Sequence, residues 1–378
     1  MFYLQSVRSM HCRIISALVF SLSLFSVTTA SAQGNAVTTG SGYCLDFTAN
    51  LGTGYVDLGS LAAIDTGNFS IEMWVNVNAC KGDPAFFSNK DWSSGNNPGM
   101  VFDVHDNGKR IRINLKAGNS TFQNIILPIN AIGRGWFHLA VTLDRSTYLK
   151  IYIDGILKSS TYLDKGLIGS FASPYTYKLG QDGTGAYSDD NGVPIPYDGK
   201  LDELRIWKTE RTEDQIKENM CRKISPLSPN LYAYYTFDAS SGDTVKDLKN
   251  TNSGKWVKGV AGSWKLSGAA IGDTSVQLYP ESGDWDNKEL LLTDALFGAM
   301  KIKNVQAVEG VQLYKVNGKP NSVKGLNTFS DNGIYYGVYL AGITTSTTYD
   351  ATLDYSTYTK ALADESNLKW FVRNQNSD

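Results

Sequence analysis

The sequence predicts an all-β protein: an antiparallel jelly-roll β-sandwich followed by a smaller β-sandwich-like domain. Three observations predict this class. The 378 residues contain 28 Asp but only 9 Glu, and Asp favours turns whereas Glu favours helices. Apolar and polar residues alternate with a period of two through several segments. Turns rich in Gly, Asp and Asn separate these segments.

The clearest alternation runs through residues 69–77. One set of side chains in this segment is apolar (Phe69, Ile71, Met73, Val75 and Val77), and the other set is Ser70, Glu72, Trp74 and Asn76. This pattern predicts a half-buried strand. Residues 136–143 repeat it. Residues 148–153 then run into Asp154-Gly155, a strong hairpin signal, and residues 156–159 are expected to return antiparallel.

One short helix is expected after these strands. Thr212 and Gln215 have the spacing of a capping box, acidic residues follow Thr212, and Ile216 and Met220 are four residues apart on one face. Residues 232–237 read as another strand. Beyond residue 262 the spacing changes, and we expect strands near Val276, Leu290, Val311, Ile334, Ala351 and Trp370.

The first 32 residues have the pattern of a secretory signal peptide. Arg8 and Arg13 precede an apolar run over residues 14–27, which is followed by Ala30-Ser31-Ala32. Cleavage is therefore expected before Gln33. The alternative, an uncleaved membrane anchor, needs about 20 apolar residues, which is more than this run offers. We predict a secreted or cell-surface protein with no membrane insertion after cleavage.

Charge and cysteine content argue against nucleic-acid binding and against a zinc site. The formal net charge is −2, so no basic excess exists to bind nucleic acid. Zinc is not expected, because the cysteines have no CxxC spacing. An exported chain can form disulfides, and three cysteines remain after residue 32: Cys44, Cys80 and Cys221. The sequence leaves all three pairings open, with Cys44 and Cys221 favoured because that bridge closes the longest loop.

A series of short motifs appears in a recognisable order over residues 43–260. The motifs are Cys44-Leu45-Asp46-Phe47, Phe69-Ser70-Ile71-Glu72-Met73-Trp74-Val75, Gly135-Trp136-Phe137-His138-Leu139, Tyr152-Ile153-Asp154-Gly155, Lys200-Leu201-Asp202-Glu203-Leu204-Arg205-Ile206-Trp207 and Tyr234-Tyr235-Thr236-Phe237-Asp238. Together they resemble the laminin G-like (concanavalin A-like) jelly roll. Residues 263–378 resemble a β-rich segment that often follows such domains in secreted bacterial proteins.

This resemblance implies a laminin G-like domain over residues 33–262 and a small β-rich domain over residues 263–378. It also implies two antiparallel sheets, often a Ca²⁺ ion at the rim, and roles in binding glycans or proteins more often than catalysis. A disulfide and a role in cell adhesion fit the same picture of a secreted domain.

No catalytic set of residues is evident. Glycanases of this superfamily carry Glu-x-Asp-x-x-Glu on one strand, and no Glu here has Asp two positions later. Glu72 is an isolated carboxylate, and we expect it to be a solvated strand residue. His138 is expected to be a packed structural histidine. The sequence therefore predicts that the protein is not an enzyme.

Two polar loops, residues 87–99 and 180–191, contain the candidate site residues. Side-chain oxygens, glycines and one aromatic residue per loop suit a Ca²⁺ site or a platform on which a sugar ring stacks. Ordinary turns remain the alternative. For calcium we select Asn89, Asp91, Asp182 and Asp189, because the loops are able to meet at one rim, and for a sugar ligand we select Trp92 and Tyr187.

The leading functional hypothesis is a secreted, noncatalytic binding or adhesion protein that recognises a glycan or a cell-surface protein through a calcium-supported rim. One alternative is a polysaccharide-degrading hydrolase or lyase, for which Glu72 and Asp202 are the residues to test. Another alternative is a structural subunit of a cell-surface assembly.

Overall fold

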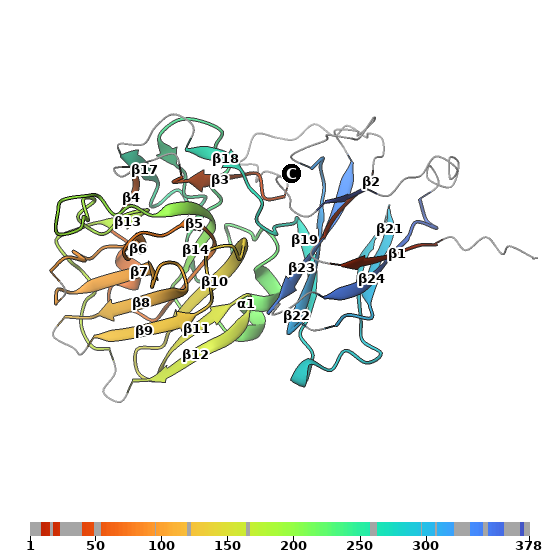
Figure 1. Cartoon of the computed structure of the whole chain (residues 1–378), viewed down its shortest axis with the longest axis horizontal. Helices are drawn as coiled ribbons and strands as arrows, with labels where there is room; N and C mark the ends of the chain where they lie inside the picture. The colour runs from red at the N-terminus through yellow and green to blue at the C-terminus, as the bar shows by residue number, and fades with distance from the viewer. Residues whose placement is uncertain are drawn as a thin grey trace, which may run out of the picture. The chain divides into compact units, whose positions relative to one another are not determined.

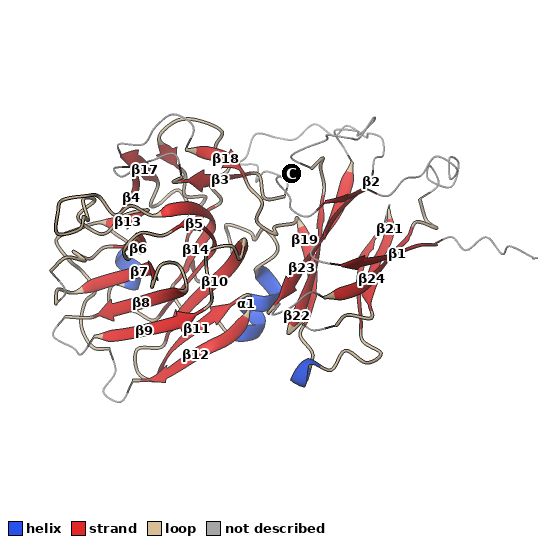
Figure 2. Ribbon diagram, in the orientation of Figure 1, coloured by secondary structure: helices blue, strands red, loops and turns tan. Residues whose placement is uncertain are grey.

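The structure is a computed structural model, and strands dominate it (Figure 2). It describes residues 9–15, 18–22, 40–48, 54–94, 96–118, 122–163, 167–257, 263–295, 297–306, 308–320, 333–342, 347–358 and 371–373. Within these ranges the helical segments are α1 (Glu213–Asn219), η1 (Ala62–Ile64) and η2 (Glu281–Gly283). None of them has the length and hydrophobicity that a membrane span requires. The predicted all-β class is confirmed.

The chain divides into two compact units. The first unit comprises residues 42–216 and 224–267, and the second comprises residues 1–41, 217–223 and 268–378. The boundary expected from the sequence lies at residue 262. In the structure the first unit reaches residue 267, because β18 (Trp264–Leu266) pairs with β3 (Tyr43–Asp46).

The first unit contains two antiparallel sheets of eight strands each (Figure 1). One sheet has the order β12-β11-β10-β5-β14-β3-β18, with β15 paired to β14. Besides β3 and β18, its strands are β5 (Phe69–Ala79), β10 (Trp136–Leu143), β11 (Tyr148–Ile153), β12 (Ile156–Tyr162), β14 (Asp198–Trp207) and β15 (Leu231–Tyr235).

The other sheet of the first unit has the order β16-β17-β4-β13-β6-β7-β8-β9. Its strands are β4 (Tyr55–Gly59), β6 (Ala85–Ser88), β7 (Gly99–His105), β8 (Arg110–Lys116), β9 (Gln123–Pro128), β13 (Tyr177–Leu179), β16 (Thr244–Val245) and β17 (Gly254–Val257). Figure 1 shows β6, β7, β8 and β9 side by side.

One hydrophobic core receives side chains from both sheets of the first unit. It includes Phe69, Ile71, Met73 and Val75 from β5, and Met100, Phe102 and Val104 from β7. These residues alternate along their strands, so the intervening side chains lie on the outer face of each sheet. The outer faces of the two sheets therefore carry the polar residues of the unit.

The short local motifs form as the sequence predicts. Thr212 Oγ1 accepts the Gln215 N–H at 3.2 Å, and Gln215 Oε1 accepts the Thr212 N–H at 3.1 Å. This reciprocal capping box starts α1. In the hairpin between β11 and β12, Asp154 (φ 57°) and Gly155 (φ 78°) both adopt positive φ, as a tight turn of this type requires.

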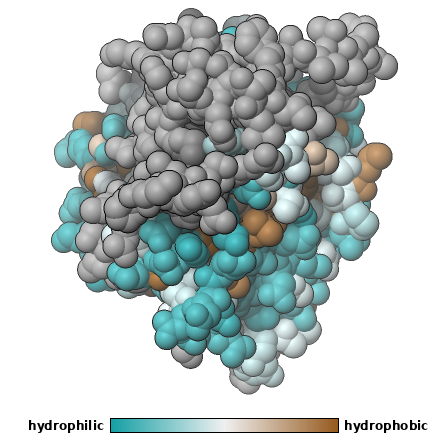
Figure 3. Space-filling model, turned by 90° about the vertical axis from the view of Figure 1, so that its right-hand side faces the viewer, coloured by the Kyte–Doolittle hydropathy of each residue, from teal (hydrophilic) through white to brown (hydrophobic). Residues whose placement is uncertain are grey.

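The second unit contains a four-stranded and a five-stranded antiparallel sheet. The first has the order β1-β24-β21-β20, and the second has the order β19-β22-β23-β2-β25. The strands are β1 (Ser9–Ile15), β2 (Leu18–Leu22), β19 (Thr274–Leu278), β20 (Glu289–Asp294), β21 (Gly298–Lys303), β22 (Gly310–Val316), β23 (Ile334–Ala341), β24 (Thr348–Asp354) and β25 (Phe371–Arg373). In the view of Figure 3, the surface of the described residues is mostly hydrophilic and has small, separate hydrophobic patches.

The N-terminal segment lies within these two sheets. β1 pairs with β24, and β2 pairs with β23 on one side and with β25 on the other. Cleavage of the predicted signal peptide would remove both strands from their sheets. The predicted cleavage point after Ala32 lies outside the described residues.

The disulfide favoured by the sequence analysis is not formed in the structure. Cys44 and Cys221 are both buried thiols that form no disulfide, and Cys80 forms none either. Cys44 belongs to the first unit and Cys221 to the second. Loop length alone suggested their pairing, but the fold assigns the two residues to different compact bodies.

Candidate functional site

The outer face of the β6–β8 region carries a connected set of polar and aromatic side chains. We call the set the Asp83 cluster; it comprises Asp83, Trp92, Asp103, His105, Arg112 and Tyr187. Asp83 lies two residues before β6, Asp103 and His105 lie on β7, and Arg112 pairs with Asp103 from β8. Trp92 and Tyr187 come from the two polar loops that the sequence analysis selected.

Asp83 is the centre of this set. Its Oδ1 accepts a hydrogen bond from the Tyr187 hydroxyl at 2.5 Å, and its Oδ2 accepts one from Trp92 Nε1 at 3.1 Å. Arg112 Nη2 also donates to Oδ2, at 2.6 Å. One carboxylate therefore holds both predicted ligand-binding aromatics and a guanidinium. Burial and the hydrogen bond to Asp83 raise the pKa of the Tyr187 hydroxyl, so it remains a donor at neutral pH.

Arg112 connects the two acids of the cluster. Its Nε donates to Asp103 Oδ2 at 2.9 Å, and its guanidinium carbon lies 4.5 Å from the centre of the Trp92 ring. Arg112 therefore packs on one face of the indole, an arrangement favourable to both groups. Trp92 and Tyr187 are half-buried, so each ring keeps part of its surface in contact with solvent.

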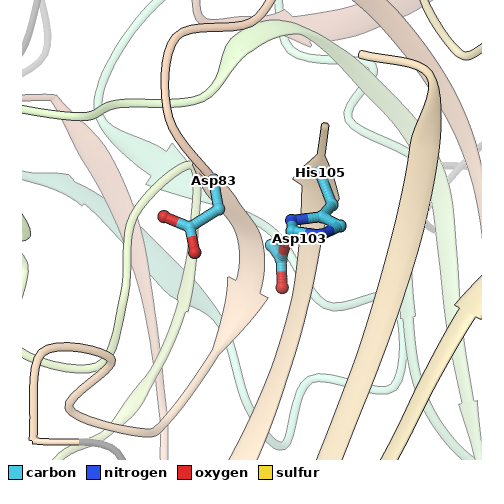
Figure 4. A group of neighbouring side chains, drawn as sticks. All are labelled: Asp83, Asp103 and His105. Carbon is cyan, nitrogen blue, oxygen red and sulfur yellow. The ribbon is translucent and has the colours of Figure 1, made fainter. Parts of the chain in front are cut away.

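Asp103 and His105 complete the cluster (Figure 4). Both side chains leave the same side of β7, and Asp83 lies across from them. Ligand atoms of the three residues lie within 4.8 Å of one another. Burial raises the pKa of Asp103 and lowers that of His105, whose imidazole is therefore neutral at pH 7. Arg112 already pairs with both carboxylates, so the cluster contains its own cation.

The two polar loops meet, as expected from the sequence. Hydrogen bonds donated by backbone N–H groups connect them. The Trp92 N–H donates to Asp182 Oδ2 at 2.9 Å, and the Gly183 N–H donates to the Lys90 carbonyl at 2.8 Å. An ideal Cβ at Gly183 would lie 2.5 Å from the Asn89 carbonyl carbon. Glycine is therefore required at this close approach of two chain segments.

Side-chain oxygens of all four residues selected for calcium accept hydrogen bonds from backbone N–H groups. Asn89 Oδ1 accepts the Met100 N–H at 2.8 Å, and the two oxygens of buried Asp182 accept hydrogen bonds from the backbone of both loops. Asp91 and Asp189 accept N–H groups two to four residues later in the chain, which is typical of Asx turns. In the described ranges, the acids, histidines and cysteines grouped in threes closely enough to share an ion are Asp83, Asp103 and His105. Calcium binding at the four selected residues stays a prediction.

A second polar set lies on the outer face of the opposite sheet. We call it the Glu72 cluster; it comprises Glu72, His138, Glu203, Arg205 and Arg211. Its members are buried, with exposed fractions of 0% for Glu72 and 1% for His138. Glu72 therefore is not the solvated residue that its alternating strand suggested. His138 is buried, as predicted.

Arginine–carboxylate pairs and a contact with the His138 imidazole connect the Glu72 cluster. The Glu72 carboxylate lies 3.7 Å from His138 Nε2 and 3.4 Å from Arg211 Nε. Arg205 Nη2 donates to Glu203 Oε2 at 2.7 Å. Glu203 lies at a register shift in β14 with φ 53°, and such a bulge aims an extra side chain at one face of a sheet.

Burial determines the protonation of this cluster. It raises the pKa of Glu72 and, with the charge of Arg205, lowers that of His138 well below its usual value. The segment that follows β14 covers the cluster: the Ser70 hydroxyl donates to the Thr209 carbonyl at 2.8 Å and accepts the Arg211 N–H at 2.8 Å. Asp202, the other candidate acid, is also 0% exposed.

Two aromatic residues selected from the sequence, Trp92 and Tyr187, lie in the Asp83 cluster. Its other members, Asp83, Asp103, His105 and Arg112, were not selected. A signal was present in residues 110–116, where Arg110, Arg112, Asn114 and Lys116 alternate with Ile111, Ile113 and Leu115. This alternation predicts a strand with a strongly polar outer face. Nothing local links Asp83 to Tyr187, which is 104 positions later.

Comparisons with known proteins agree with the fold. The family model described as the concanavalin A-like lectin/glucanases superfamily, of laminin G type, matches residues 50–217. A comparison with curated proteins finds no match.

Several solved structures are similar to the chain at low sequence identity. A Bacteroides ovatus protein described as a candidate carbohydrate-binding protein is 20% identical, with a TM-score of 0.46 over 62% of this chain and 62% of that one, less than two thirds of its length. Domain 4 of the extracellular arabinanase AbnA from Geobacillus stearothermophilus, in complex with arabinotriose, is 17% identical (TM-score 0.31, 47% of this chain and 96% of that one). The CBM40 module of the Ruminococcus gnavus IT-sialidase, bound to α2,3-sialyllactose, is 15% identical (TM-score 0.35, 44% and 91%).

The family match and the two antiparallel sheets point to the same assignment. The matched residues include β4 through β14, which contribute strands to both sheets of the first unit. Residues 50–217, which make up most of the first unit, thus match the concanavalin A-like lectin/glucanases superfamily, as the resemblance of the sequence motifs predicted.

Proposed function

We propose that this protein is a secreted, noncatalytic carbohydrate-binding protein, and that the Asp83 cluster is its sugar-binding site. One observation supports this most directly. Trp92 and Tyr187, which are 95 positions apart in two different loops, donate to the same carboxylate on the polar face of a sheet. Partly exposed aromatic rings held in place by charged, hydrogen-bonding side chains suit a sugar, because its ring stacks while its hydroxyls bind polar groups.

The alternative of a polysaccharide-degrading enzyme relies on Glu72 and Asp202. Both carboxylates are 0% exposed in the structure. No observation on these two residues favours catalysis, and the proposal is therefore for binding. Cell adhesion through a surface glycan is one use of such binding.

The test is a glycan array and isothermal titration with the wild-type protein and Trp92→Ala. We expect Trp92→Ala to weaken binding by about 2 kcal/mol, roughly 30-fold, as loss of a central aromatic contact does. Tyr162→Ala is the matched control, because Tyr162 is a 60% exposed aromatic residue on β12 of the other sheet. Equal binding by wild type and Trp92→Ala would place the site elsewhere.

The proposal also includes secretion of the protein and a Ca²⁺ ion that stabilises the loops at the rim. If the signal peptide is cleaved as the sequence predicts, the exported protein begins at Gln33. Mass spectrometry of the exported protein determines this residue.

If the rim binds calcium with the millimolar affinity of extracellular sites, Ca²⁺ at about five times the dissociation constant stabilises the native state by about 1 kcal/mol relative to EDTA. Asp91→Ala should abolish that difference; a wild-type protein with the same melting temperature in both solutions would refute a calcium site.

A further inference from the structure

The cations on the outer face of β8 differ in how their charge is balanced. Arg110, Arg112, Asn114 and Lys116 alternate along this strand and lie on one face. Arg112 pairs with Asp83 and Asp103, and Arg110 pairs with Asp106 at 3.2 Å. Lys116 has no carboxylate partner among the described residues, and Lys116 Nζ donates to the carbonyl and side-chain oxygens of Asn96 at 2.8 and 2.6 Å.

A second uncompensated cation lies next to Lys116. Lys90 follows β6, is 0% exposed, and donates from Nζ to Asn114 Oδ1 at 3.0 Å. It also has no carboxylate partner among the described residues, and Nζ lies 5.7 Å from the centre of the Trp92 ring. A buried ammonium with a single neutral acceptor is costly, so the region favours an anion.

From these positions we infer that the ligand of the proposed site is an anionic polysaccharide, whose carboxylate or sulfate groups lie at the Lys90–Lys116 end of the Asp83 cluster. This inference rests on the proposed function, because Trp92 supplies the stacking surface for the sugar ring. Lys116, which is partly exposed, makes the direct contact with the anion. Lys90 lies beneath the surface and acts on the same anion through its charge.

The protonation of Lys90 adds a second consequence. Burial, with a smaller effect from the Lys116 charge, lowers the pKa of the Lys90 ammonium to about 8. A bound anion favours the charged form and raises this pKa again. Binding is therefore expected to weaken as the pH rises from 7 to 9, and to be accompanied by proton uptake near pH 8.5.

The experiment measures binding of alginate, carrageenan, agarose and laminarin by titration calorimetry at low and moderate salt. Alginate carries carboxylates and carrageenan carries sulfate esters, so these two arms distinguish the sources of the anion. Agarose is the neutral counterpart of carrageenan, and laminarin is a second neutral glycan. We expect binding to alginate or carrageenan, and we expect Lys90→Met and Lys116→Met each to weaken it about tenfold at low salt.

The variants separate this inference from the proposed function. Lys116 is partly exposed, so Lys116→Met remains informative if Lys90→Met does not fold, and Lys265→Met on β18 is the matched control in the other sheet. Binding to neutral glycans that requires Trp92 but neither lysine overturns the inference and leaves the proposed function intact. Absence of binding to all four glycans overturns the inference, and the glycan array then tests the proposed function by itself.

Discussion

The first unit presents two polar clusters on the outer faces of its two sheets, and they differ in what covers them. In the Asp83 cluster the side chains of Asp83 and Arg112 are 28% and 11% exposed. In the Glu72 cluster the side chains of Glu72 and Arg205 are 0% and 1% exposed. Both clusters contain two acids, a histidine and at least one arginine. Their chemical composition is therefore similar, and their accessibility is not.

The cover explains the difference. The segment that follows β14 lies over the Glu72 cluster, where Arg211 approaches Glu72 and packs 3.9 Å from the centre of the Trp207 ring. In the Asp83 cluster, the groups that pack on the central Asp83 carboxylate include two half-buried members of the cluster itself, Trp92 and Tyr187. A polar outer face of a sheet thus stays partly accessible or becomes fully enclosed according to the segments that pack over it.

The largest expected effect is on folding, in the Glu72 cluster. Arg205→Met removes the guanidinium from buried Glu203, and we expect it to lower the free energy of unfolding by about 3–5 kcal/mol. Urea denaturation measures this. Arg110→Met is the control on the other sheet; its pair with Asp106 is exposed, so a loss of less than about 0.5 kcal/mol is expected. Equal losses for the two variants would contradict the distinction between buried and exposed pairs.

The second prediction concerns pH and compares the two histidines. The pKa of His138 lies well below 6.5 in the folded state because of burial, whereas in the unfolded state it is near 6.5. As the pH falls below 6.5 the unfolded state takes up a proton that the folded state excludes, so stability decreases. The loss attributable to His138 at pH 5.0 reaches at most about 2 kcal/mol, the value for a folded state that binds no proton at this position.

His138→Gln removes this contribution, and denaturation curves at pH 7.5 and 5.0 for wild type and variant measure it. His105 provides the comparison, since its pKa is also lowered but the residue is half-buried. His105→Gln is therefore expected to change the pH dependence less than His138→Gln. The opposite order would show that the cover over the Glu72 cluster admits water.

A smaller effect on stability than in the Glu72 cluster is expected at Asp83. Asp83→Asn keeps the shape of the side chain but weakens its charge-assisted hydrogen bonds to Arg112 and Tyr187. We expect a loss of about 1 kcal/mol in stability, because the group is partly exposed. Glycan binding should nevertheless fall about tenfold, because Trp92 and Tyr187 are no longer held together. A variant that loses stability but not affinity would make Asp83 structural only.

Local sequence patterns predicted much of the fold. The strand at residues 69–77, the hairpin at Asp154-Gly155 and the capping box of α1 all depend on neighbours within a few positions, and all three are present. Several strands had no prediction of their own, among them β4, β6, β7, β8, β9, β21 and the strands formed by the N-terminal segment. β21 lacked a recognised signal, and the apolar segment over residues 14–27 was assigned to export.

Part of the candidate site was also predictable. Trp92 and Tyr187 were selected from loop composition, and they do lie together. Asp83 was missed because its partners are 9, 29 and 104 positions away, and no local pattern records such contacts. The disulfide between Cys44 and Cys221 failed for a related reason, since loop length carries no information on which unit each cysteine joins.

The sequence by itself determined which residues face the core and which face outward, because that alternation follows from the period of the strand. It also determined where the chain turns, since Asp, Asn and Gly tolerate the backbone conformations of turns. Only the tertiary structure decided which outward-facing residues remain accessible. Burial depends on segments distant in the chain, and those segments enclose Glu72 but leave part of Trp92 and Tyr187 in contact with solvent.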